Sequence, residues 1–331
     1  MDILSEILTS NIYKKILDYV ELNKLIPPKS KIIIGLSGGP DSVFLLHFLN
    51  SIKQKFDLVL IAAHLDHEWR ENSKQDLIFC ENLARSLDIE FIGQKASNVN
   101  LEKKYSGSKE ELGRVLRRNF FQNLITEYDT NLIALAHHQD DQEETFFIRL
   151  IRGAGISGLA SIRPKTGLYI RPILCVNKKE ILDFLEENKI KYLIDPTNLS
   201  DDFLRNRIRN KVIPALKDID NRFDLNLLKA IANLQAADSF LEKLTEQYFS
   251  ESCEIIDHKF YLDTKKFFLL DEFIQDRVIL LWLCKTGVKF TPTSKLFDEI
   301  KRFFKQSKSK THQIYKAWQI VKTKNLVHIA K

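Results

Sequence analysis

The sequence predicts an α/β protein with a doubly wound parallel sheet and a smaller, mainly helical C-terminal domain. Short apolar runs alternate with stretches of helical spacing from residue 31 to about residue 136. Such alternation is typical of a parallel sheet that is covered by helices on both faces. After Gly153, Gly and Pro residues punctuate the chain, and a long amphipathic helix is expected from about residue 224 to residue 250. The predicted boundary between the two domains lies between residues 216 and 217, just after Pro214.

The elements of the first domain are expected in a regular order. The predicted strands are "KIIIGL", "FDLVLIAAHLDH", "IEFIGQK" and "TNLIALAHH". The predicted helices between and after them are "SVFLLHFLNSIKQ", "NSKQDLIFCENLARSLD", "SGSKEELGRVLRRNFFQNLITEYD" and "QDDQEETFFIRLIRG". In the third helix, Ser108 and Glu111 have the spacing of a capping box. A later helix at about 177–188, a short strand, "IKYLID", and the segment "DPTNLSDDFLRNRIRNKVIPAL" complete this domain.

Composition narrows the class of protein. The 331 residues are 44% hydrophobic and 28% charged, which is ordinary for a globular protein. The apolar runs are too short for a membrane span, and the N-terminal stretch lacks the character of a presequence. The four cysteines have neither metal-site nor disulfide spacing, so we expect a cytoplasmic protein without a membrane partner. The net charge of +6 fits a nucleic-acid partner and a biased composition equally well.

The stretch "IIIGLSGGPDSVFLLHFL" (32–49) has the character of a phosphate-binding loop. Gly38 and Gly39 allow backbone N–H groups to approach an anion, and the following helix presents its positive end to the same place. Ser37 and Ser42 add hydroxyl groups, but Asp41 would repel a phosphate unless a cation lay between them. Mg²⁺ is commonly held by one or two carboxylates plus substrate phosphates. The alternative is a simple strand-to-helix turn with Asp41 near the N-cap.

A second acidic cluster follows the strand "TNLIALAHH". In "AHHQDDQEETFFIRLIRGAG", Asp141 and Glu144 are three residues apart and share a helix face, as do Asp140 and Glu144. We expect the opposite, buried side of this helix to carry Phe146, Phe147, Leu150 and Ile151. An acidic helix start that only contacts solvent is the alternative, because the helix dipole favours acids there. Together, the two clusters predict a metal-bridged nucleotide site at one sheet edge.

These residues resemble a known family. "SGGPDS" is similar to the PP-loop of the N-type ATP pyrophosphatases, which have an adenine nucleotide alpha-hydrolase-like fold. "HLDHEWR", "HHQDDQEETFFIRLIRGAG", "RPIL" and "DPTNLSDDFLRNRIRNKVIPAL" resemble, in this order, the motifs of the tRNA(Ile)-lysidine synthase family. The resemblance covers about residues 30–216.

The resemblance implies a two-step ligation that uses ATP and Mg²⁺. ATP adenylates the C2 carbonyl oxygen of the wobble cytidine of tRNA(Ile) with a CAU anticodon. The ε-amine of free L-lysine then displaces AMP, which gives lysidine. The first step creates a leaving group at a carbon that amines do not otherwise attack, and the resemblance assigns tRNA binding to residues 217–331.

The resemblance also assigns site residues. The ATP-binding residues would be Ser37, Gly38, Gly39, Pro40, Asp41, Ser42 and His64, and the metal ligands Asp41, Asp141 and Glu144. Arg114 would act in catalysis, and the tRNA-binding residues would be Arg117, Arg205, Arg207 and Arg209. On a helix, Arg205 and Arg209 share a face that Arg207 does not, so the three arginines cannot all play the same part.

Several alternatives remain open from the sequence. A related tRNA thiolase would need suitably spaced cysteines, and a non-catalytic nucleotide sensor would not need the second acidic cluster. Asp140 and Glu143 are the candidates for binding the lysine substrate. His137 and His138 follow a strand directly, and we expect one of them to be buried. The sequence leaves the oligomeric state open, with a homodimer preferred.

Overall fold

The computed structural model describes residues 11–69, 73–99, 109–130, 132–194, 203–288, 290, 293–306, 310–315 and 318–331. The chain divides into two compact units, Met1–Ala232 and Asn233–Lys331. Each unit has its own sheet and its own hydrophobic core. None of the helices in the described part of the chain combines the length and apolar character that a membrane crossing needs.

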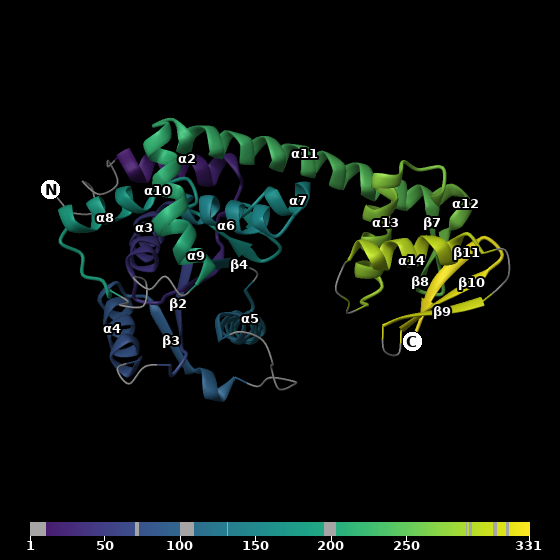
Figure 1. The fold of residues 1–331 in the computed structure, drawn as a ribbon. Helices are drawn as coiled ribbons and strands as arrows, with labels where there is room; N and C mark the ends of the chain where they lie inside the picture. Colours follow the sequence, from purple (N-terminus) through teal and green to yellow (C-terminus); the bar gives the residue numbers. More distant parts are fainter. Residues whose placement is uncertain are drawn as a thin grey trace. The chain divides into compact units, whose positions relative to one another are not determined.

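A six-stranded sheet forms the centre of the first unit (Figure 1). The strands are β1 (Lys31–Gly35), β2 (Val59–Asp66), β3 (Glu90–Lys95), β4 (Leu132–Ala134), β5 (Lys165–Thr166) and β6 (Tyr169–Ile170). Their spatial order is β3-β2-β1-β4-β6-β5; all neighbours pair in parallel except β5, which is antiparallel to β6. The order runs outward from β1 in both directions, which confirms the predicted doubly wound sheet.

The helices of the first unit follow the predicted alternation. They are α2 (Asn11–Leu22), α3 (Pro40–Phe56), α4 (Ser73–Ser86), η1 (Ala96–Asn98), α5 (Lys109–Glu127), α6 (Gln139–Ile151), α7 (Ile156–Leu159), α8 (Lys178–Glu187), α9 (Leu204–Arg207), the π-helix η3 (Ile208–Val212) and α10 (Ile213–Ile219). The long helix α11 (Phe223–Ser252) begins in this unit and contains the division between the units. Ser108 of the expected capping box lies outside the described residues.

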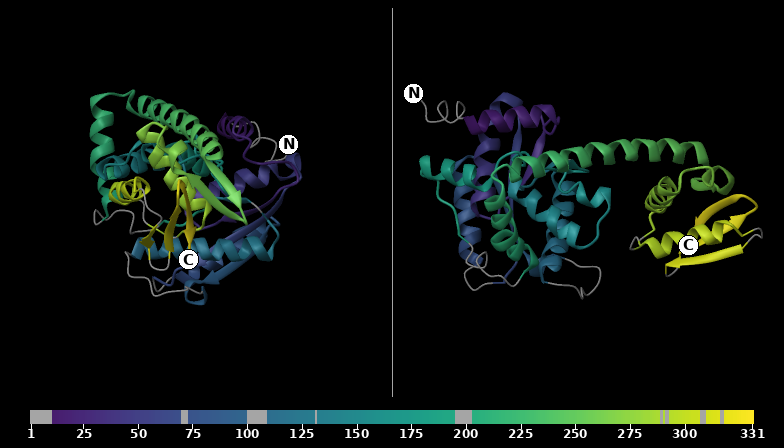
Figure 2. Two further views of the ribbon diagram at one scale, coloured as in Figure 1. Left: turned by 90° about the vertical axis from the view of Figure 1, so that its right-hand side faces the viewer. Right: turned by 45° about the horizontal axis from the view of Figure 1, so that its top comes forward.

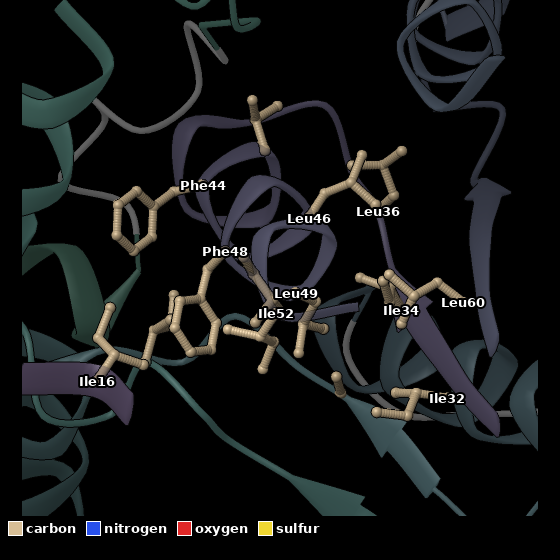
Figure 3. Packing of buried hydrophobic residues seen from close by; sticks show 14 of the residues in the cluster. Ile16, Ile32, Ile34, Leu36, Phe44, Leu46, Phe48, Leu49, Ile52 and Leu60 are labelled. Atoms are coloured by element: carbon tan, nitrogen blue, oxygen red, sulfur yellow. The ribbon is translucent and has the colours of Figure 1, made fainter. Parts of the chain in front are cut away.

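Both faces of the central strand are buried. Ile32 and Ile34 of β1 pack in one core cluster with Phe44 and Phe48 of α3, as Figure 3 shows. Ile33 belongs to a second cluster, which also contains residues of α5. Side chains alternate between the two faces of a strand, so consecutive isoleucines suit a strand that is covered on both sides. This burial fixes the direction of β1 and therefore the place where its loop emerges.

The expected short strand "IKYLID" does not form in its described residues. Residues 190–194 have no regular secondary structure. The N–H of Leu193 instead donates a hydrogen bond of 2.9 Å to the carbonyl of Gly38. The segment therefore borders the loop that follows β1 and does not extend the sheet.

The second unit combines helices with a five-stranded antiparallel sheet (Figure 2). Its further elements are β7 (Cys253–Ile256), β8 (Lys259–Asp263), α12 (Thr264–Phe267), α13 (Glu272–Lys285), α14 (Ser294–Phe304), β9 (Lys310–Tyr315), β10 (Trp318–Thr323) and β11 (Leu326–Ala330). The strand order is β7-β8-β11-β10-β9. Fully buried Trp282 and Phe304 lie in its core. The predicted helical C-terminal region is thus present, and a sheet accompanies it.

Candidate active site

Two adjoining cavities lie at the carboxyl ends of β1, β2 and β4. Strand order reverses at β1, which pairs with β2 on one side and β4 on the other. Ligands of open α/β sheets bind at this point. One cavity, of about 260 Å³, contacts Gly35, Ala63 and Leu135, and the second, of about 830 Å³, extends to α8 and α9. The residues that line both cavities are Ser37, Asp41, His64, Leu65, His67 and Arg117.

The loop between β1 and α3 is held in shape by its own side chains. Gly38 has φ +82°, and a Cβ there would lie 2.7 Å from Cδ1 of Leu193. Glycine is required at this position because the backbone has a positive φ and because a side chain would collide with Leu193. The hydroxyl of Ser42 is buried, accepts from the N–H of Ser37 and donates to the carbonyl of Gly39. Pro40 begins α3, where a missing N–H costs no hydrogen bond.

Replacing Gly38 with Ala is therefore expected to destabilise the fold by about 1–3 kcal/mol, because it forces a left-handed residue against Leu193. Gly39→Ala is the matched control, since Gly39 has φ −70° and an added Cβ would lie 3.6 Å from its nearest neighbour. Urea unfolding of both variants measures the difference. Equal stability of the two variants would contradict the geometric argument.

Asp41 and Asp141 come together although 100 positions separate them in the sequence. Asp41 lies in the first turn of α3 and Asp141 in the first turn of α6. One carboxylate oxygen of each lies 3.7 Å from Nε2 of the buried His138. Asp141 also accepts the N–H of His138 at 3.0 Å. The structure thus unites the two acidic segments that the sequence analysis placed at one sheet edge.

The acids around His138 raise the pKa of its imidazole. Burial alone would lower its pKa, but Asp140, Asp141 and Asp41 outweigh burial and raise the pKa to about 9. The neighbouring His137 has its pKa lowered to about 4, chiefly by burial. The expectation that one histidine of the pair is buried is confirmed for His138. Three carboxylates therefore surround this imidazole, those of Asp41, Asp140 and Asp141.

The donor set suits a magnesium ion that substrate oxygens complete. In the described part of the chain, no group of three or more His, Cys, Asp or Glu side chains is arranged to hold a metal alone. Mg²⁺, however, usually takes only one or two carboxylates together with phosphates and water. Asp41 and Asp141 fit this pattern, and Asp41 already holds a cation, the ammonium of Lys178, at 2.6 Å.

The sequence analysis missed Lys178. This residue begins α8, its N–H donates to Asp140 at 3.1 Å, and its Nζ donates to Asp41. A lysine in the first turn of a helix opposes the helix dipole. The sequence did contain a sign that Lys178 has a special role: it occupies this unfavourable position in a helix whose start is marked by the Asn177–Glu180 capping box. The loop lacks its own lysine, and α8 supplies one instead.

Glu144 faces arginines in this structure. Its carboxylate is fully buried and accepts from Nε of Arg209 at 2.5 Å, and Nε of Arg205 lies 3.5 Å away. Burial raises the pKa of Glu144 in spite of these two guanidinium groups. The prediction that Arg205 and Arg209 share a face is confirmed, and Arg207 is exposed at the end of α9. The role of Glu144 as a metal ligand stays a prediction.

The predicted buried side of α6 was wrong. Leu150 and Ile151 are 48% and 60% exposed, whereas the buried residues are Gln142, Glu143, Glu144 and Thr145. This polar face can be buried because other segments of the chain supply hydrogen bonds and ion pairs to its side chains. The side-chain amide of Gln142, for example, exchanges two hydrogen bonds with the backbone of Ile162. Apolar spacing alone could not reveal these partners.

The π-helix η3 lies between α9 and α10 and positions Arg209. Pro214 follows it at the start of α10, where it cannot donate a hydrogen bond to the preceding turn. π-helical turns are rare and often occur at functional sites. Arg205, but not Arg209, lines the larger cavity, as does Arg117 of α5; Arg114 lies outside both linings.

The two candidates for the lysine pocket have other partners. Asp140 accepts the N–H of Lys178, and Glu143 lies 3.4 Å from Nζ of Lys217 on α10. Burial raises the pKa of Glu143 to about 7. Neither residue lines the two cavities.

His64 lies two residues before the end of β2, beside the loop. Its Nδ1 lies 2.9 Å from the carbonyl oxygen of Leu36, and burial lowers its pKa. A carbonyl only accepts, so Nδ1 carries the hydrogen of a neutral ring. Nε2 is then left as a hydrogen-bond acceptor in a residue that lines both cavities.

The fold and this loop define a PP-loop protein. The family model of the PP-loop domain matches residues 8–216. The chain is 35% identical over 257 residues to a tRNA(Ile)-lysidine synthase of Clostridium perfringens strain 13, covering 77% of this chain and 55% of that protein. It is 30% identical over 323 residues to the tRNA(Ile)-lysidine synthase of Persephonella marina, covering 96% and 69%. The chain belongs to the tRNA(Ile)-lysidine synthase family.

Two further comparisons bear on length and fold. The chain spans about half the length of the first curated relatives it matches. The U34-tRNA thiolase NcsA of Methanococcus maripaludis, solved with its 4Fe-4S cluster, superposes with a TM-score of 0.58 at 18% identity. That match covers 68% of this chain and 78% of the thiolase. At this identity the likeness concerns the fold alone.

Proposed function

We propose that the chain ligates free L-lysine to C2 of the wobble cytidine of tRNA(Ile) with a CAU anticodon. ATP first adenylates the C2 carbonyl oxygen and releases pyrophosphate; the ε-amine of lysine then displaces AMP to give lysidine. Family membership supports this assignment. The observation that carries it is the meeting of Asp41 and Asp141 at one nitrogen of His138, at the carboxyl ends of β1 and β4.

The loop residues would bind the phosphates of ATP. Backbone N–H groups of Gly38 and Gly39 and the N-terminus of α3 attract anions, and the exposed residue Ser37 lines both cavities. The neutral His64 would accept a hydrogen bond from the nucleoside. Asp41 and Asp141 would hold Mg²⁺, which neutralises charge on the departing pyrophosphate when it is bound. Lys178 lies next to these carboxylates and would contact the phosphates.

Arginines would bind the RNA and the activated base. Arg117 and Arg205 line the larger cavity. Glu144 would hold Arg205 and Arg209 in place, in addition to its predicted metal role. Arg114 as a catalytic residue and Arg207 as a tRNA contact remain parts of the proposal that rest on the family resemblance.

We assign the ATP-pyrophosphatase activity to residues 1–216 and tRNA binding to residues 217–331. From Ile300 to Lys331 the chain has nine Lys or Arg and no Asp or Glu. Lys301 and Lys322 of this set are buried. The exposed members among the described residues could balance phosphate charge; they are Arg302, Lys305, Lys310, Lys324 and Lys331. A cytoplasmic location and a homodimer belong to the same proposal, and light scattering of the purified protein tests the dimer.

A thiolase function is less favoured. Cys80 lies under the loop, where its Sγ would be 3.3 Å from a Cβ at Gly38. Burial raises the pKa of Cys80 to about 12, and that of Cys175 as well. A thiol with such a pKa is a poor nucleophile at neutral pH.

The assay is incorporation of labelled lysine into tRNA transcripts with ATP and Mg²⁺. We expect modification of tRNA(Ile) with the CAU anticodon, equimolar pyrophosphate release, and none of either product without tRNA. The matched control is tRNA(Met), which has the same anticodon. Equal modification of both transcripts would refute the substrate assignment, and sulfur transfer in place of lysine transfer would favour the thiolase.

A further inference from the structure

The larger cavity has an aromatic wall outside the phosphate loop. Trp69 lies just beyond β2, lines this cavity, and is 41% exposed. Its indole stacks on the imidazole of His67, with ring centroids 4.5 Å apart and 24° between the planes. Large exposed aromatic side chains beside a charged cavity are typical of sites that stack nucleobases.

The two rings pack against helix α5 at Gly113. A Cβ at Gly113 would lie 2.7 Å from Cη2 of Trp69 and 3.5 Å from Cε1 of His67. Glycine at this position therefore lets the indole pack against the helix. The ring is supported by His67 and by α5 while two fifths of it stays exposed. Such a supported ring loses little conformational entropy when a ligand stacks on it.

The ring pair is also uncharged. Burial, with help from the nearby Arg117, lowers the pKa of His67 to about 4. The imidazole is therefore neutral at physiological pH and offers no positive charge to a phosphate. Arg117, Arg205 and Lys178 line the same cavity and supply the positive charge that a nucleotide's phosphates need.

We infer that Trp69, backed by His67, is the stacking platform for the cytosine base that enters the active site. This inference rests on the proposed function and adds a base-binding residue to it. Adenine of ATP is the other candidate base. The smaller cavity, at the ends of β1, β2 and β4, is the better place for the nucleoside of ATP, and Trp69 does not line it. The platform therefore lies in the larger cavity, apart from the place that we assign to the nucleoside of ATP.

The test uses the full chain with Trp69→Ala and Trp69→Phe. Ile78→Ala is the matched control, because Ile78 is an exposed apolar residue on α4 of the same unit and lines neither cavity. Affinity is measured for an anticodon stem-loop RNA with C34 and for the same RNA with an abasic position 34. Loss of one base stack corresponds to a weakening of about five- to a hundredfold.

We expect Trp69→Ala to weaken binding of the C34 RNA within this range and to bind the abasic RNA like the wild type. Trp69→Phe and Ile78→Ala should stay within about threefold on both RNAs, and the KM for ATP should not change. Equal affinity of Trp69→Ala and wild type for the C34 RNA would overturn the inference. So would an equal loss on the abasic RNA, and a selective rise of the KM for ATP would assign the platform to adenine.

Fluorescence keeps the inference testable if Trp69→Ala does not fold. The difference in emission between wild type and Trp69→Phe reports on Trp69, because the other two tryptophans are Trp282, which is fully buried, and Trp318 of the second unit. The C34 RNA should quench this difference and the abasic RNA should not; quenching by both, or by neither, would refute stacking. Base-dependent quenching without lysidine formation would instead refute the proposed function and leave the platform intact.

Discussion

Replacing Asp41 or Asp141 with Asn is expected to lower the rate of ATP-dependent lysine ligation by about 1,000-fold or more. The two carboxylates lie 3.7 Å from one nitrogen of His138, and Asp41 already binds the ammonium of Lys178. An amide keeps the shape of the side chain but cannot balance a divalent cation. A 1,000-fold loss corresponds to about 4 kcal/mol, which is typical for loss of charge stabilisation at a reacting phosphate.

The measurement is pyrophosphate release and lysine incorporation over a Mg²⁺ titration. We expect both variants to need far more Mg²⁺ than the wild type and to remain folded by circular dichroism. Asp57→Asn is the matched control, because Asp57 is an exposed aspartate at the opposite end of α3 and asparagine tolerates its left-handed backbone. Wild-type activity of Asp41→Asn at low Mg²⁺ would contradict the metal role.

The second large effect is expected for Glu144→Gln. Glu144 is fully buried and faces Arg205 and Arg209. The carboxylate is buried, but the side chains of Arg205 and Arg209 are 28% and 40% exposed, so water can solvate the guanidinium group that loses its partner. We therefore expect the substitution to cost about 1–3 kcal/mol of the free energy of unfolding. Because Arg205 also lines the larger cavity, the variant should bind tRNA more weakly even where it remains folded.

Urea unfolding followed by circular dichroism measures this loss. Arg207→Gln is the control for stability, because Arg207 belongs to the same short helix and is exposed. We expect the control to change the free energy of unfolding by less than about 0.5 kcal/mol. A loss below about 1 kcal/mol for Glu144→Gln would show that the carboxylate is not the centre of this cluster.

The parts of the fold that could be predicted depend on local patterns. The consecutive isoleucines of β1 predicted a strand that is buried on both faces, and the structure places them in two core clusters. The helical spacing of apolar residues after Asp41 predicted the helix that follows. The meeting of Asp41 and Asp141 also followed, since each acid lies in the first turn of a helix that follows one of two neighbouring parallel strands. Position relative to a strand end was sufficient for these residues.

The parts that escaped prediction depend on distant partners. Lys178 reaches Asp41 across 137 positions of sequence, and Arg209 reaches Glu144 across 65. The buried polar face of α6 likewise depends on α7, α9 and η3, which follow it in the chain. Hydrophobic spacing describes one helix at a time and cannot report that a later arginine will neutralise a buried acid.

The bond between Lys178 and Asp41 has a consequence for the proposed reaction. If Asp41 holds Mg²⁺ as proposed, the ion would compete with this ammonium for the carboxylate. Once freed, the amine remains tethered at the start of α8 and can return when the products leave. In the proposed reaction, its return would restore the Lys178–Asp41 contact that the structure shows.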